Sequence, residues 1–208
     1  MNKAFVWYSV FYLLLTSSST FAQGELTFLF NNTLQAEKQT KWLGAIDGKG
    51  DFDDVIMPKA DYISKNIYEF SKNVGIAFTT SLLQDDYVIE MYLYLENTDE
   101  KSKIIDFTNR ISAEGIYTQY GKIIIGEQKS EKIVFQDEEY VHVLFVRNKK
   151  QEFLVYANGQ KVISVDDTEK KYVLSGENIA QFFVDDCEGH ARGIAGGIAL
   201  FKIFPYQK

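Results

Sequence analysis

The sequence predicts an all-β fold, a sandwich of two antiparallel sheets. Short runs rich in β-branched and aromatic residues recur along the chain, and Gly, Asn and Asp turn formers separate them. No stretch longer than about ten residues carries an amphipathic helical period. The central segment, residues 140–167 with the sequence YVHVLFVRNKKQEFLVYANGQKVISVDD, predicts three consecutive antiparallel strands.

This central segment alternates strands with strong turn signals. Val141–Arg147 is rich in β-branched and aromatic residues, and the polar residues Asn148–Glu152 turn the chain back along Phe153–Ala157. Asn158 and Gly159 then suit the two positive φ angles of a type I′ turn. The third strand contains the branched residues Val162, Ile163 and Val165.

The N-terminus, Met1–Ala22, predicts a secretory signal peptide. A basic start precedes the apolar run Ala4–Leu15, and Thr20 and Ala22 occupy the −3 and −1 positions of a cleavage site. The run is shorter than the about 20 residues that span a bilayer, so no membrane span is expected. We therefore expect an exported protein, periplasmic or secreted, whose mature chain, Gln23–Lys208, forms one domain.

The chain is acidic. The formal net charge is −7, and removal of the signal peptide takes away one Lys and no acid, which leaves −8. Nucleic acid and anionic membranes require a basic footprint, so neither is expected as the main partner. Cys187 is the only cysteine, so we expect no internal disulfide and a packed rather than a reactive thiol.

The N-terminal half begins with a predicted strand at Gly24–Phe30. The acidic stretch Asp47–Asp54, DGKGDFDD, has alternate carboxylates around glycines, a pattern that can gather oxygen ligands for Ca²⁺. The EF-hand pattern does not fit, because Lys49 stands at the third position and no Glu closes a twelve-residue loop. A hydrogen-bonded turn and a Ca²⁺ site both remain open.

The next segment, Lys59–Asn73, is the least regular of the chain, and one short helical turn is predicted over Ile63–Phe70. Two strands follow, at Val74–Leu83 and Tyr87–Glu96. The polar residues Gln84–Asp86 between them predict a hairpin turn.

The strand Tyr87–Glu96 is the most informative one. Its alternation predicts one face toward the core, with Tyr87, Ile89, Met91, Leu93 and Leu95. The opposite face places Tyr92 and Tyr94 between Glu90 and Glu96, which would present stacking rings beside hydrogen-bonding carboxylates. An alternative interpretation is that the preceding irregular segment covers the two tyrosines.

The C-terminal half continues the pattern of short strands. Strands are predicted at Lys103–Asn109, within Gly115–Gly126, and at Ile179–Val184. The last one, Ile198–Phe204, is expected to close against the first strand. His142, alone on its strand face among apolar residues, is expected to be a packed, hydrogen-bonded side chain.

The loop Asp185–Arg192, DDCEGHAR, concentrates chemically capable side chains. A ligand-binding rim or a Ca²⁺ site would use Asp185, Asp186, Glu188, His190 and Arg192. The alternative is that the aspartates cap a turn through their own side chains, as Asp does at strand ends.

Three stretches in the same order resemble the LamG-like (concanavalin A-like lectin/glucanase) jelly-roll domains. The central segment carries the His-Val strand start and the VYANG turn of these domains. Ala45–Pro58 is similar to their opening, and Phe182–Phe204 to their closing hairpin. The resemblance implies a two-sheet jelly-roll sandwich.

The resemblance also implies an exported, lectin-like and non-catalytic module that recognises carbohydrate or a cell-surface partner. Polysaccharide-active enzymes of the same fold, hydrolases or lyases, are an alternative, as is a protein-interaction or structural domain. Glu90 and Glu96 stand roughly 20 Å apart along their strand, whereas glycosidase carboxylates stand within about 9.5 Å. This strand alone therefore cannot hydrolyse a glycoside. The ligand and the oligomeric state are left open.

Overall fold

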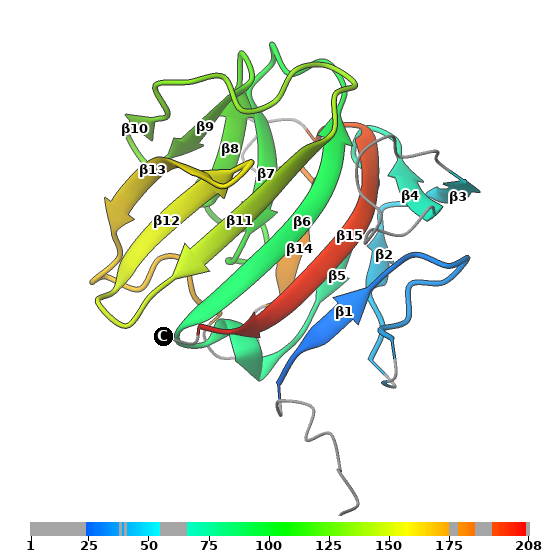
Figure 1. Ribbon diagram of the computed structural model, residues 1–208, viewed down its shortest axis with the longest axis horizontal. Helices are drawn as coiled ribbons and strands as arrows, with labels where there is room; N and C mark the ends of the chain where they lie inside the picture. The colour runs from blue at the N-terminus through cyan, green and yellow to red at the C-terminus, as the bar shows by residue number, and fades with distance from the viewer. Residues whose placement is uncertain are drawn as a thin grey trace, which may run out of the picture.

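Two antiparallel sheets pack face to face in the computed structural model, which describes residues 24–37, 39, 41–54, 66–174, 179–185 and 193–206 (Figure 1). The front sheet has the order β13 (Gln160–Asp166), β12 (Glu152–Ala157), β11 (Val141–Arg147), β6 (Tyr87–Leu95), β15 (Gly196–Pro205), β4 (Asn66–Phe70) and β3 (Asp51–Asp54), and β1 (Leu26–Phe28) also pairs with β15. The predicted all-β, jelly-roll-like sandwich is confirmed.

The back sheet has the order β10 (Gln128–Lys129), β9 (Lys122–Ile125), β8 (Ile116–Gln119), β7 (Ser102–Asp106), β14 (Ala180–Phe182), β5 (Gly75–Phe78) and β2 (Gly44–Ile46). A single 3-10 turn, η1 (Ser81–Leu83), is the only helical element among the described residues. In that same part of the chain, no helix is long and apolar enough to cross a membrane.

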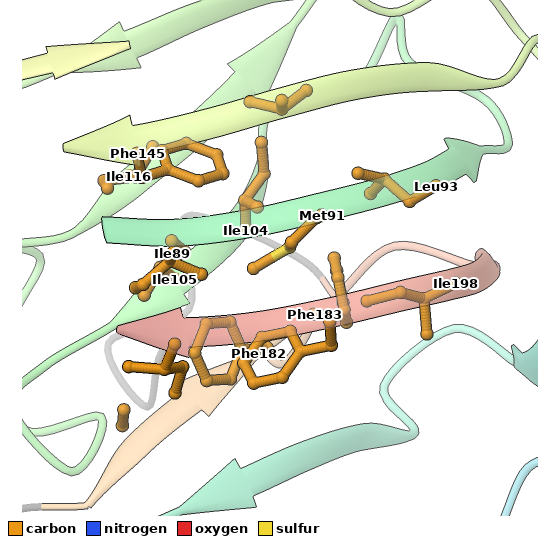
Figure 2. Packing of buried hydrophobic residues seen from close by; sticks show 14 of the residues in the cluster. Ile89, Met91, Leu93, Ile104, Ile105, Ile116, Phe145, Phe182, Phe183 and Ile198 are labelled. Atoms are coloured by element: carbon orange, nitrogen blue, oxygen red, sulfur yellow. The ribbon is translucent and has the colours of Figure 1, made fainter. Parts of the chain in front are cut away.

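Strand β6 lies at the centre of the front sheet, between β11 and β15. Its odd-numbered residues from Tyr87 to Leu95 are completely buried, as their alternation predicts. Figure 2 shows Ile89, Met91 and Leu93 of this strand packed among apolar side chains from both sheets. Phe182 of β14 meets Phe201 of β15 edge to face, with ring centroids 5.0 Å apart. The core therefore fills the space between the sheets and leaves the opposite face of β6 outside it.

The central segment forms the predicted meander of β11, β12 and β13. Asn158 and Gly159 have φ angles of 47° and 78°, as the type I′ interpretation requires. The last strand also closes against the first, with Leu26 opposite Ile203.

Two predicted hairpins are wrong. Gln84–Asp86 do not join paired strands, because β5 belongs to the back sheet and β6 to the front sheet, with η1 between them. The closing hairpin over Phe182–Phe204 fails for the same reason, since β14 lies in the back sheet and β15 in the front sheet. In both places the chain crosses between layers, which local turn chemistry does not reveal.

The predicted helical turn over Ile63–Phe70 is also wrong where it is described, because its second half forms strand β4. Tyr68 of this strand is completely buried, and its hydroxyl accepts a 2.8 Å hydrogen bond from the backbone N–H of Gly50. Burial of the aromatic side chains on the core face of β4 therefore favours the extended conformation.

Among the described residues, two ion pairs have both side chains buried in the sandwich. Lys103 Nζ lies 2.6 Å from Asp106 Oδ2, and both side chains are completely buried. Arg147 Nε donates to Asp167 Oδ2 at 2.6 Å, also out of contact with solvent. Each of these charges needs its oppositely charged partner, because an unpaired buried charge is strongly destabilising.

Candidate functional site

The outer face of the front sheet, opposite the core, carries three of the sequence-predicted site residues. Glu90, Tyr92 and Tyr94 alternate along β6 and are each half-buried. The register of the sheet places His142 of β11 beside Tyr92 and Lys202 of β15 beside Glu90. Residues fifty or more positions apart in sequence therefore meet on this face.

Glu90, His142 and Lys202 form the polar cluster of the outer face. His142 Nε2 lies 2.8 Å from Glu90 Oε1, and Lys202 Nζ lies 3.9 Å from Glu90 Oε2. The hydrogen bond from His142 lowers the pKa of Glu90 against the opposing effect of burial, and Lys202 adds to the lowering. His142 is thus packed and hydrogen-bonded, as predicted, and its partner is the site candidate Glu90.

Tyr92, Tyr94 and Tyr140 form the tyrosine patch. The rings of Tyr92 and Tyr140 are stacked, with centroids 5.3 Å apart and planes 18° apart. Tyr94 meets Tyr140 edge to face at 5.1 Å, and its hydroxyl donates to Glu69 Oε1 at 2.9 Å. Burial raises the pKa of the Tyr94 and Tyr140 hydroxyls, which therefore stay protonated at neutral pH.

The structure tests only part of the alternative interpretation, that Lys59–Asn73 covers the tyrosines. Glu69 of this segment binds Tyr94, and Ile67 packs in the same cluster as the patch. Residues 59–65 lie outside the described residues. The rings of the patch therefore stay half-buried, with two neighbours from β4.

A groove with a volume of about 630 Å³ lies at the other end of the outer face. Its apolar floor comes from β6, β11 and β12, with Val88, Leu144, Val146 and Leu154. Its aromatic side chains are Tyr156, Phe204 and Tyr206, and the remaining lining residues are Glu25, Asn148, Glu152 and Pro205. The groove lies on the opposite side of the polar cluster from the tyrosine patch, since Val88 and Tyr92 flank Glu90 on β6.

The other predicted site, the loop Asp185–Arg192, is described only at Asp185. Arg110 Nε donates to the Asp185 carbonyl at 3.0 Å, and its terminal nitrogen donates to the Asp185 carboxylate. A second terminal nitrogen of Arg110 lies 2.7 Å from Asp47 Oδ2. Asp185 therefore helps to hold three loops together. The other candidates of this loop lie outside the described residues: Asp186, Glu188, His190 and Arg192.

A Ca²⁺ site remains a prediction. Asp47 of the acidic stretch is engaged by Arg110. Within the part of the chain that the structure describes, no three His, Cys, Asp or Glu side chains are grouped to hold a metal ion.

Several residues of the outer face were not predicted as site residues. They include Tyr140, Tyr156, Lys202, Phe204 and Tyr206. Alternation along the last strand could have identified three of them. Lys202, Phe204 and Tyr206 are at even positions, so they are expected on the sheet face opposite to the buried Phe201 and Ile203.

No protein-family model matches the chain, and no curated protein matches its sequence. Solved structures are similar in fold. Botulinum neurotoxin type C, in a structure concerned with its interaction with two ganglioside molecules, has a TM-score of 0.58 and 12% identity over 88% of this chain and 49% of that chain.

Two further structures are similar to the same degree. The binding domain of Paraclostridial Mosquitocidal Protein 1 has a TM-score of 0.58 and 11% identity over 89% of this chain and 49% of that one. The binding domain of botulinum neurotoxin DC in complex with rat synaptotagmin II has a TM-score of 0.57 and 13% identity over 88% and 48%. This chain spans about half the length of these chains, and what it shares with them is the β-sandwich fold.

Proposed function

We propose that this chain is a non-catalytic binding module that recognises carbohydrate through the tyrosine patch and the polar cluster. The observation that carries the proposal is their position side by side on one sheet face, with Tyr92 next to Glu90 on β6 and His142 opposite Tyr92 on β11. Sugars have apolar C–H faces that pack on aromatic rings and hydroxyl groups that bond to charged side chains. The outer face offers both kinds of contact.

The lowered pKa of Glu90 argues against a role as the general acid of a glycosidase. A glycosidase acid needs a raised pKa, whereas His142 and Lys202 lower the pKa of Glu90. Its strand neighbour Glu96 is six residues away, or roughly 20 Å along an extended chain. Glu90 and Glu96 are therefore too far apart to act together on one glycosidic bond.

A cell-surface protein is the second candidate partner. Of the structures with a similar fold, one concerns the interaction of its protein with ganglioside molecules and another holds its protein in complex with synaptotagmin II, and this chain matches about half of each. The resemblance to LamG-like domains and the predicted export through Met1–Ala22 agree with either partner. Half-buried tyrosines beside a polar cluster favour carbohydrate.

The proposal is tested by incubating the protein with a panel of polysaccharides, with and without calcium. Depletion of the protein from solution and release of reducing or unsaturated ends are scored together. We expect depletion without product. Tyr92→Ala and Tyr94→Ala should each weaken binding about tenfold or more, equivalent to about 1.4 kcal/mol.

The matched control is Tyr120→Ala, which removes a tyrosine that is 59% exposed in the turn between β8 and β9 of the back sheet. It should leave binding unchanged. Thermal unfolding of all variants checks that they remain folded. Product release would overturn the non-catalytic proposal, and the absence of depletion by every polysaccharide would make a protein partner the leading candidate. Unchanged binding by both patch variants would place the site elsewhere.

A further inference from the structure

The groove at one end of the outer face is separate from the tyrosine patch and has a chemistry of its own. Alternation along β12 places Glu152, Leu154 and Tyr156 on the same face of the sheet. The register sets Leu154 beside Val146 of β11, which in turn lies beside Val88 of β6. These three side chains are buried at the floor of the groove although they face away from the core.

The aromatic side chains come from β12, the outermost strand of this floor, and from the end of β15 on its other side. Tyr156 belongs to β12, and Phe204 and Tyr206 lie at the end of β15 and just after it. All three are half-buried and pack against the floor. The groove therefore holds three ring systems around an apolar base.

The charges of the groove are all negative. Glu25 and Glu152 are its only charged lining residues, and no Lys, Arg or His is among the described residues that line it. Two lysines lie just beyond the lining: Lys202 of β15 is paired with Glu90 of the polar cluster, and Lys161 of β13 lies opposite Tyr156. Asn148 fixes one of the two carboxylates, since its Nδ2 donates to Glu152 Oε2 at 2.8 Å.

We propose that this groove binds a small organic cation, an ammonium group carried on an apolar body. Aromatic rings attract cations through their negative faces, and carboxylates add direct attraction. The apolar floor receives the body of the ligand. The volume of about 630 Å³ lies in the range typical of small-molecule sites. An anion would meet two carboxylates and no cation among the lining residues, and a neutral ligand would gain only the apolar contact.

The test uses the complete protein and benzyltrimethylammonium, with titration followed by calorimetry. Two compounds of similar shape serve as comparisons: the uncharged carbon isostere neopentylbenzene and the anion benzenesulfonate. We expect the cation to bind at least about tenfold more tightly than either comparison compound, and its affinity to fall with added salt. Equal binding of the neutral isostere, or no binding of the cation, would overturn the proposal.

Variants locate the site. The double variant Glu25→Gln with Glu152→Gln should weaken cation binding about tenfold, and Tyr206→Leu should weaken it while keeping an apolar side chain. The matched control is Glu127→Gln, an exposed carboxylate in the turn between β9 and β10 of the back sheet. If the groove variants bind the cation as tightly as the control does, this assignment is wrong.

The cation site and the carbohydrate site can fail independently. Tyr92→Ala should leave cation binding unchanged, and Glu152→Gln should leave polysaccharide binding unchanged, because the groove and the tyrosine patch share no residue. Thermal unfolding confirms that each variant is folded before its affinity is compared.

Discussion

At the scale of single residues, Glu90 connects three strands of the front sheet. It belongs to β6, it bonds His142 of β11, and it faces Lys202 of β15. One half-buried carboxylate therefore holds a histidine and a lysine in place on the outer face. An apolar side chain at this position would leave both without their acceptor.

The ionisation of Glu90 predicts a pH dependence of stability. Its folded pKa lies below the ordinary value of 4.5, so its stabilising contribution is fully present above that value and is lost as the pH falls through the folded pKa. We expect Glu90→Gln to lower the free energy of unfolding at about pH 7 and to have a smaller effect at about pH 3. Urea unfolding of both proteins at the two pH values measures this difference, and an equal effect at both would contradict it.

The buried pair of Lys103 and Asp106 predicts a large loss of stability on substitution. Lys103→Met removes the cation from a completely buried carboxylate, which should cost about 3–5 kcal/mol. The control is Lys72→Met, whose 2.8 Å pair with Glu100 is exposed and should contribute less than about 1 kcal/mol. Denaturant unfolding measures both, and similar costs for the two variants would contradict the prediction.

At the scale of elements, β15 shapes the outer face through a bulge and a pair of glycines. Its register shifts between Ile198 and Leu200, so that Ile198 packs in the core while Ala199 and Leu200 both join the cluster beneath the tyrosine patch. Gly197 lies opposite Tyr94, and a Cβ atom there would come within 2.4 Å of the Tyr94 ring. The ring of Tyr94 therefore occupies space that the glycine leaves free.

Gly197→Ala should displace the Tyr94 ring and lower stability by about 1–3 kcal/mol, the usual cost of overpacking. It should also weaken polysaccharide binding, because the Tyr94 ring is part of the patch. The matched control is Gly44→Ala in β2, where a Cβ atom meets only Ala77 at 3.9 Å or more. Thermal unfolding and the binding assay compare the two variants, and a Gly197→Ala protein that behaves like the control would contradict the argument.

At the scale of the whole molecule, the sandwich is held by its core and its strand pairing. The chain contains a single cysteine, so no disulfide can close within one molecule. The large aromatic and branched core between the two sheets supplies the burial instead. The first and last strands pair with each other, which joins the two ends of the fold.

This composition predicts that a reducing agent leaves the unfolding temperature of the protein unchanged. Differential scanning calorimetry with and without reductant measures it. The control is the Cys187→Ser variant, which should respond in the same way as the unchanged chain. A shift in the unchanged chain that the variant lacks would indicate a disulfide between two molecules and would contradict the prediction.

Much of the fold and part of the site follow from local pattern. The alternation along Tyr87–Glu96 determined its two faces, and with them the positions of Tyr92 and Tyr94, because successive side chains of a strand point to opposite sides. The turn at Asn158 and Gly159 follows as directly, because few residues accept two positive φ angles. These features depend only on neighbours along the chain.

Only the tertiary structure decided which sheet each strand joins and which distant side chains meet. Gln84–Asp86 look like a hairpin turn, yet β5 and β6 belong to different layers. His142 lies 52 positions from the Glu90 that it binds, and nothing in either local sequence indicates the other. The physical reason is that sheet membership is decided by the burial of apolar faces across the whole sandwich, whereas turns and alternation are properties of a few consecutive residues.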